Sequence, residues 1–154
     1  MKERPFEQMD PWYKGWKGDI NENGPLKYDV IGTHEFDSDD DTCTISEIPV
    51  GKSTQDYKKF LEELENQGDI DGFEEHHAKG QVEFLIYGDM EALKKKSKSK
   101  GGVEKFLKLR GSIATSNMVL FDHEKKIYKY QTAEDIMKAW FDLRQDLYVK
   151  RKAW

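Results

Sequence analysis

The spacing of apolar residues predicts a helix near the middle of the chain. Its apolar positions recur every three to four residues and are Tyr57, Phe60, Leu61 and Leu64. This period places one apolar stripe along a helix over residues 55–67. Thr54 is a suitable N-cap for this helix, and Gly68 is a suitable C-terminal stop.

A second and longer helical pattern begins after Thr132, which is also a good N-cap. Its first turn is acidic and its last turn is basic, and both arrangements complement the helix dipole. Its apolar residues are Ile136, Met137, Trp140, Phe141, Leu143, Leu147 and Tyr148. We expect Ile136, Trp140 and Phe141 to dock on the domain's own sheet. Because no stop signal follows, we also expect this helix to continue in a longer polypeptide.

Runs of β-branched and aromatic residues predict strands over 27–31, 42–48 and 82–87. The acidic run 38–41 suits a solvated hairpin loop that joins the strand 27–31 to its partner, the strand 42–48. A second hairpin is predicted from the runs 118–121 and 127–130. All of these strands are short and are separated by turn residues, which favours antiparallel pairing.

Two shorter helices complete the predicted elements. One covers 90–98 and frays into a lysine-rich loop, and the other is a single turn over 103–107. The predicted fold class is therefore α+β, with a mostly antiparallel sheet packed against helices and a long C-terminal helix.

Composition and charge qualify this picture. Of the 154 residues, 36% are hydrophobic and 36% are charged, so the core is thin but sufficient for one folded domain. The formal net charge is −5, whereas DNA-binding domains are usually basic. Acidic residues gather in 37–41 and 62–75, and lysines gather in 94–100 and 125–129. One face can therefore still be positive, although we expect the lysines of 94–100 to form a solvated loop.

The chain lacks the patterns on which metal, nucleotide or membrane chemistry depends. The single cysteine, Cys43, forms no zinc framework with the four histidines, and we expect His76 and His77 to be surface or hydrogen-bonded residues. Residues 51–53 end like a phosphate-binding loop but lack its upstream glycine. No apolar run approaches the roughly 18 residues that a membrane span needs. We predict no catalytic residue, no metal site and no membrane segment.

A more specific pattern lies near the N-terminus, where aromatic and basic side chains alternate between glycines. It reads Pro11-Trp12-Tyr13-Lys14-Gly15-Trp16-Lys17-Gly18-Asp19-Ile20. This segment resembles the one that opens the tower domain of eukaryotic DNA topoisomerase II. Further blocks follow in that family's order, at 45–50, 54–58, 115–123, 141–144 and 148–152. Ordered blocks along nearly the whole chain are more specific than any single motif.

The resemblance implies a tower domain over 1–131 and the start, over 132–154, of a long helix that leads to the coiled coil and exit gate of a dimer. It implies a nuclear parent enzyme that passes one DNA duplex through another and uses ATP and Mg²⁺. The family's catalytic tyrosine, metal-binding domain and ATPase lie upstream of the tower. This chain alone should therefore be inactive, without a cofactor of its own, and monomeric.

The resemblance also assigns residues that contact double-stranded DNA. Ile20 corresponds to the isoleucine that wedges between base pairs of the duplex, where an apolar side chain unstacks a base step and bends the DNA. Lys14 and Lys17 could neutralise phosphates, and Lys52 is a further phosphate candidate. Gly18 would let the backbone approach DNA closely.

Several neighbouring positions qualify these assignments. Tyr13 and Trp16 are expected to pack against protein more than to stack on bases. Asp19 stands where the family usually has a threonine, and Ser53 stands where it usually has a tryptophan. The run 94–100 resembles a local insertion.

Two other functions remain open at this point. The chain could be a scaffold that holds the dimer gates apart and binds no DNA on its own, which the net charge of −5 favours. It could also be an unrelated small enzyme, which would need a deep pocket with convergent titratable groups. The position of Ile20 bears on the wedge, because an edge position supports that role and deep burial counts against it.

Overall fold

The computed structural model describes residues 5–37, 39–78 and 80–154. They form two compact units. The larger unit covers 12–113, and the smaller unit combines the N-terminal residues up to Pro11 with 114–154. The domain boundary predicted after residue 131 falls inside the smaller unit.

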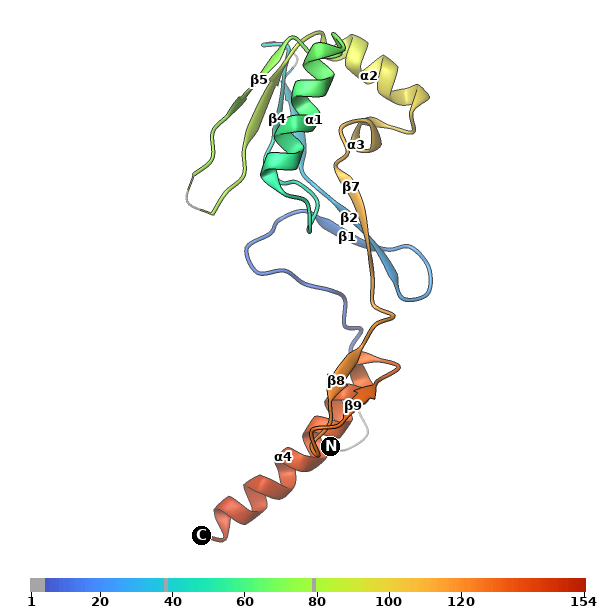
Figure 1. Cartoon of the computed structure of the whole chain (residues 1–154), viewed down its shortest axis with the longest axis vertical. Coiled ribbons are helices and arrows are strands. Elements are labelled where there is room, and N and C mark those ends of the chain that lie inside the picture. The colour runs from blue at the N-terminus through green and yellow to red at the C-terminus, as the bar shows by residue number, and fades with distance from the viewer. Residues whose placement is uncertain (1–4, 38, 79) are drawn as a thin grey trace. The chain divides into compact units, whose positions relative to one another are not determined.

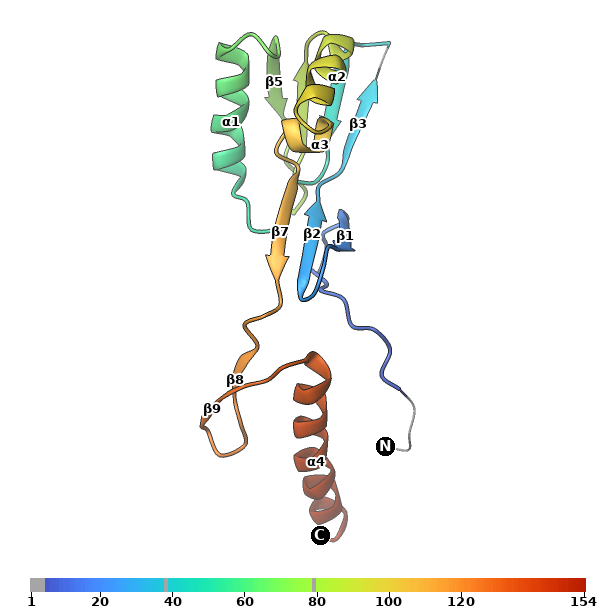
Figure 2. The same cartoon turned by 90° about the vertical axis from the view of Figure 1, so that its right-hand side faces the viewer.

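A three-stranded sheet with the order β1-β2-β7 lies in the larger unit. Its strands are β1 (Asp19–Glu22), β2 (Lys27–Ile31) and β7 (Arg110–Ala114). β1 and β2 pair antiparallel, and β7 runs beside β2 (Figure 2). The strand predicted over 27–31 is confirmed, and the other two strands were not predicted. The predicted pairing of 27–31 with 42–48 is wrong, because β2 lies between β1 and β7 and the partner of β4 (Thr42–Ile45) across the acidic hairpin is β3 (His34–Asp37).

A four-stranded antiparallel sheet with the order β3-β4-β6-β5 carries most of the core. Its strands are β3 (His34–Asp37), β4 (Thr42–Ile45), β5 (Gly72–Glu75) and β6 (Phe84–Tyr87). The hairpin around the acidic run joins β3 to β4, although Ser38 in that run lies outside the described residues. The prediction that β4 reaches residue 48 is wrong, because the amides of Ser46 and Glu47 turn away to the Thr33 carbonyl.

The helix α1 (Thr54–Asn66) lies along this sheet (Figure 1). Its predicted apolar stripe is buried, and Gly68 ends it in a left-handed conformation with φ +70°. The predicted N-cap is wrong by one residue. Ser53 caps the helix, because its side chain accepts a hydrogen bond of 3.2 Å from the Gln55 amide.

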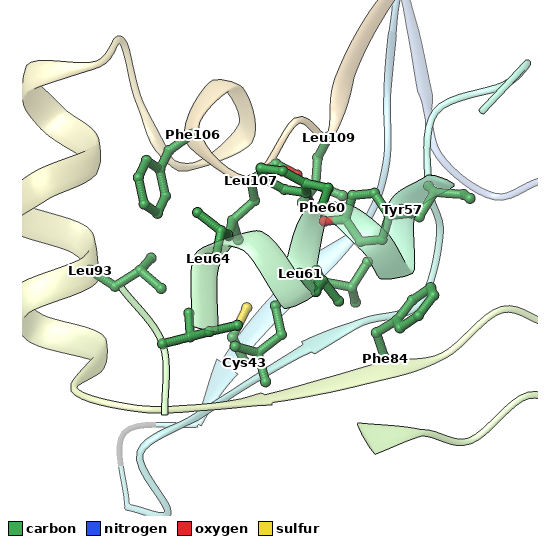
Figure 3. Close-up of a cluster of buried hydrophobic side chains, with 14 of the residues drawn as sticks. Cys43, Tyr57, Phe60, Leu61, Leu64, Phe84, Leu93, Phe106, Leu107 and Leu109 are labelled. Carbon is green, nitrogen blue, oxygen red and sulfur yellow. Dashed lines mark hydrogen bonds between the residues drawn. The ribbon is translucent and has the colours of Figure 1, made fainter. Parts of the chain in front are cut away.

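The main core lies between α1 and one face of the four-stranded sheet (Figure 3). The alternating residues Cys43 and Ile45 on β4 oppose Ile86 and Phe84 on β6, so all four share the buried face. The helices α2 (Met90–Ser99) and α3 (Val103–Phe106) add further buried apolar residues. Burial raises the pKa of the Cys43 thiol to about 12, so this cysteine is an inert core residue.

The lysines of 94–100 do not form the loop that was predicted. Most of them lie on α2, which continues to Ser99. The ammonium of Lys94 lies 4.7 Å from the centre of the Phe36 ring, and Lys96 forms an ion pair with Asp69. These contacts link α2 to Phe36 on β3 and to Asp69, and α2 ends slightly later than predicted.

The smaller unit consists of a hairpin and a long helix. The strands β8 (Val119–Phe121) and β9 (Ile127–Lys129) pair antiparallel, and α4 (Ala133–Lys152) follows. The predicted hairpin and the predicted cap are confirmed, since the Thr132 side chain accepts from the Asp135 amide at 3.2 Å. No helix in the described residues has the length and apolar character needed to cross a membrane.

The docking of α4 on the domain's sheet stays a prediction, because α4 and the two larger sheets belong to different units. No residue of α4 is buried, and Trp140 is 59% exposed. The apolar side of the helix faces a groove whose other wall is the β8–β9 hairpin, with Leu120 and Phe121 among its lining residues. A hairpin with strands of only three residues offers too little surface to bury the apolar stripe of α4.

Candidate nucleic-acid interface

The aromatic and basic segment before β1 forms a turn that is fastened to the protein. Gly15 adopts φ +85°, and the Trp16 amide donates to the Tyr13 carbonyl at 3.3 Å. The indole Nε1 of Trp16 donates to the Ile48 carbonyl at 2.9 Å. The predicted packing of Trp16 is therefore confirmed, while Tyr13 meets its ring edge-on and stays 37% exposed.

Gly18 occupies a position with no room for a side chain. A Cβ atom there would lie 2.3 Å from the Ile31 carbonyl oxygen and 2.3 Å from a ring carbon of Trp16. Contacts this short are not tolerated, so the protein's own packing already requires glycine at this position. Close approach of its backbone to DNA stays a prediction.

Ile20 lies on β1, which is an outer strand of its sheet. It is half-buried and does not belong to the main core cluster. Its partner on β2 is Val30, which is fully buried. Directly opposed residues point to the same face of a sheet, so Ile20 covers the margin of Val30 at the edge. This is neither the deep burial that would count against a wedge nor full exposure.

Lys14 and Lys17 are exposed and flank the turn. The Lys17 backbone amide donates to a Glu47 carboxylate oxygen at 3.2 Å, which holds this part of the loop in place. Within the described parts of the chain, neither lysine ammonium has an ion pair or a hydrogen-bond partner. Both charges are therefore available to an external anion.

Lys52 lies in the predicted turn after Pro49, which is closed by a hydrogen bond of 3.1 Å from the Lys52 amide to the Pro49 carbonyl. Its side chain is only partly exposed. The ammonium donates to the Lys108 carbonyl at 3.1 Å and lies 5.3 Å from the centre of the Tyr57 ring. Burial, followed by the charge of Lys108, lowers the pKa of Lys52. Lys52 is therefore held in one place, unlike Lys14 and Lys17.

Arg110 was not singled out from the sequence, and its charge is already neutralised. Its guanidinium pairs with the Asp29 carboxylate at 2.5 Å, and the Asn23 side chain donates to the same oxygen at 2.9 Å. Hydrogen bonds from Arg110 and then Asn23 hold the pKa of Asp29 below its usual value. This cluster links β7, β2 and the end of β1. Its role is therefore to stabilise the sheet, and the Arg110 charge is not free to bind a ligand.

The described residues contain no arrangement suited to metal chemistry, since no group of three or more His, Cys, Asp or Glu side chains converges. The predicted roles of His76 and His77 are confirmed, because they contact Glu74 and Glu75 at 2.9 and 3.4 Å. A groove of about 420 Å³ in the smaller unit is lined by Asp122, among others. Its Oδ1 accepts two turn amides, which gives that carboxylate a structural role.

Comparison with known proteins gives consistent matches along the whole chain. The A-subunit family of DNA gyrase/topoisomerase IV matches residues 1–154. DNA topoisomerase 2 of Plasmodium falciparum (isolate K1 / Thailand) is 38% identical over 157 residues, which is 100% of this chain and 11% of that protein. DNA topoisomerase 2-beta of Homo sapiens is 38% identical over 152 residues, which is 95% of this chain and 9% of that protein.

A solved structure agrees with these sequence matches. It is the crystal structure of the DNA-binding, cleavage and re-ligation domain of Plasmodium falciparum topoisomerase II. The TM-score is 0.83 at 38% identity, and the match covers 97% of this chain and 20% of that one. The chain thus spans about a tenth of the length of its curated relatives.

Fold and sequence both match segments of type II DNA topoisomerases, which confirms the predicted resemblance and the α+β fold class. The chain belongs to the A-subunit family of DNA gyrase/topoisomerase IV.

Proposed function

We propose that this chain is a DNA-binding and DNA-bending module of a type II topoisomerase, in which Ile20 wedges between base pairs of duplex DNA. The position of Ile20 supports this most directly, because a half-buried isoleucine on an outer strand lies outside the main core. An apolar wedge costs a few kcal/mol of base stacking and is repaid by the added contact that a bend permits.

The residues before Ile20 suit the same role. Lys14 and Lys17 carry unpaired charges on a loop that is fastened by Trp16, so they can neutralise phosphates beside the wedge. Gly18 keeps the backbone next to the wedge free of a side chain. Recognition of this kind depends on the flexibility of base steps and little on base edges, so we expect weak sequence preference.

In the parent protein this module would act together with domains that lie outside this chain. We infer that the parent is a nuclear, dimeric enzyme that uses ATP and Mg²⁺ to pass one duplex through another. The 154-residue chain would bend DNA without cleaving it, and would be monomeric. The segment 132–154 would begin the helix that leads to the dimer's exit gate.

The wedge can be tested by fluorescence energy transfer between the ends of a short duplex, titrated with the chain at low salt. Ile20→Ala should reduce the bend at saturation at least about twofold and change affinity much less, because most of the affinity comes from phosphate contacts. Ile113→Ala is a matched control, since Ile113 is a half-buried isoleucine on β7, the opposite outer strand. Equal bending by Ile20→Ala and the unaltered chain would remove the wedge.

A scaffold function is the second candidate, and the net charge of −5 favours it. On this view the chain holds other parts of the enzyme apart and does not bind DNA by itself. Titration of labelled duplex at low salt separates the two functions. No binding at high micromolar protein would support the scaffold.

A further inference from the structure

Lys108 has a backbone conformation that normally favours glycine. Its φ is +51°, and it follows directly after the short helix α3 and its C-cap, where a helix often ends with a left-handed glycine. The Leu109 amide donates back to the Glu104 carbonyl at 2.6 Å and closes this helix end. A side chain with a Cβ is disfavoured in this region. Residues held in such conformations cluster at functional sites, so the choice of lysine here calls for a reason.

The residues beside Lys108 hold it firmly. Leu107 and Leu109 are fully buried on either side. The Tyr57 hydroxyl donates to the Leu107 carbonyl at 2.8 Å, and the Gly32 amide donates to the Leu109 carbonyl at 2.8 Å. Lys108 itself is exposed, so its side chain starts from a rigidly held backbone and lies at the protein surface.

The ammonium groups of Lys108 and Lys52 gather over the same aromatic ring. Nζ of Lys108 lies 4.0 Å from the centre of the Phe60 ring, and Nζ of Lys52 lies 5.8 Å from it. The hydrogen bond from Lys52 to the Lys108 carbonyl keeps the two residues together. Figure 3 shows Phe60 of α1 and Leu107, the residue that precedes Lys108, within the same buried cluster. Two cations from distant parts of the sequence therefore converge on one surface.

This pair of like charges has no ion-pair partner within the described residues. Asp56 is the acidic group that acts on Lys52, and it offsets only part of the effect of burial and of Lys108 on the Lys52 pKa. Two neighbouring ammonium groups repel each other, and an anion that contacts both would relieve that repulsion. The arrangement is thus complementary to a small, strongly charged oxyanion.

We propose that Lys52 and Lys108 together bind one phosphate of the DNA backbone. The inference rests on the proposed DNA-binding function and adds Lys108, which lies far from the wedge segment in sequence. Lysine ammonium groups bind phosphate as point charges and need no fixed fork geometry. Lysine would then be kept at a glycine-type position because its charge is needed there.

The test compares two substitutions of the same kind in the 154-residue chain. Lys108→Gly removes the ammonium and relieves the backbone, so chemical denaturation should show an unchanged or higher midpoint. Affinity for a labelled duplex at low salt should fall about three- to tenfold, and the slope of log K against log salt should fall by about 1. Lys125→Gly is the matched control, because Lys125 is exposed and has φ +63° in the β8–β9 turn. The affinity of the Lys125→Gly variant for the duplex should fall less than about twofold.

Lys52→Ala and the double variant test whether the two lysines share one phosphate. In that case the loss in the double variant should be clearly smaller than the product of the two single losses, because contacting residues are not additive. Independent losses that multiply would overturn the shared site.

Three further outcomes are distinguishable. If Lys108→Gly binds as tightly as the unaltered chain, this inference fails and DNA binding stands. If Lys125→Gly loses as much as Lys108→Gly, only net charge matters and the site is overturned. If the unaltered chain does not bind duplex, the proposed function fails and this inference fails with it.

Discussion

Gly18 lies where the ring of Trp16 meets the carbonyl of Ile31, and it shows how one missing Cβ can decide the course of a loop. The indole can reach the Ile48 carbonyl only because it passes over this glycine. The loop that carries Lys14 and Lys17 is therefore positioned by a packing contact. Its position does not depend on ion pairs made by these two lysines.

Gly18→Ala should destabilise the larger unit by about 1–3 kcal/mol, because the added methyl must displace a backbone carbonyl or the Trp16 ring. Urea denaturation measures this. Gly72→Ala is a suitable control, since a Cβ on Gly72 would meet only a Glu65 carboxylate oxygen at 3.8 Å. A Gly18→Ala midpoint equal to that of Gly72→Ala would contradict the packing argument.

At the scale of elements, the three-stranded sheet is joined by a charge cluster as well as by backbone hydrogen bonds. Asp29 on β2 accepts from Arg110 on β7 and from Asn23 next to β1. Its pKa is lowered in the folded state, chiefly by the Arg110 hydrogen bond. A lowered carboxyl pKa stabilises the fold above the unfolded value of about 3.9, and that contribution is lost as pH falls through the folded value.

Asp29→Asn should therefore be less stable than the unaltered chain near neutral pH. The difference should be constant above about pH 5 and should shrink as the pH falls below about 4, where the carboxyl is protonated first in the unfolded state and, at lower pH, in the folded state. Denaturation curves recorded between about pH 2.5 and 7 test this. A difference that stays constant to the acid end of that range would show that the ionised carboxylate is not the stabilising species.

How far the sequence predicts these elements depends on their length and period. The helices at 54–66 and 133–152 repeat an apolar stripe over several turns, so they were predicted nearly to their ends. β1 and β5 have four residues with a single large apolar side chain each, and β7 is little richer. Such strands form because a neighbouring strand pairs with them, and the residues of the strand itself do not reveal which segment that neighbour is.

The residues of the candidate site also differ in how far the sequence can predict them. The segment 11–20 is continuous, so its resemblance to the segment that opens the family's tower domain could draw attention to Ile20, Lys14 and Lys17. The pairing of Lys52 with Lys108 depends on α1 placing Phe60 beneath both side chains. No local pattern contains that information, and a φ of +51° at a lysine cannot be read from residue type.

For the whole molecule, the contrast between its two units is the main feature. Every buried residue among those described lies within 12–113, and the smaller unit has none. A helix without a buried face is stabilised mainly by its own hydrogen bonds and caps, which is marginal for a helix of 20 residues in water.

Amide hydrogen exchange should reveal this contrast. Amides of β4, β6 and α1 should exchange only through global unfolding, and those of α4 should exchange much faster, through local opening. The comparison of α1 with α4 is internal, because both are regular helices in one polypeptide. Equal protection of the two helices would show that α4 is buried in a way that these contacts do not include.

The shorter of the two chain connections between the sheets of the larger unit is Gly32-Thr33, between the end of β2 and the start of β3, and the other runs from β6 through α2 and α3 to β7. Both amides are bonded, Gly32 to Leu109 and Thr33 to Glu47, and a Cβ on Gly32 would lie 2.2 Å from the Glu47 carbonyl oxygen. This crossing is clamped on both sides and cannot act as a free pivot. Under the proposed DNA-bending function, a torque applied to the β1–β2 hairpin by a stiff duplex would therefore be transmitted to the hydrophobic core and would not be lost in a flexible linker.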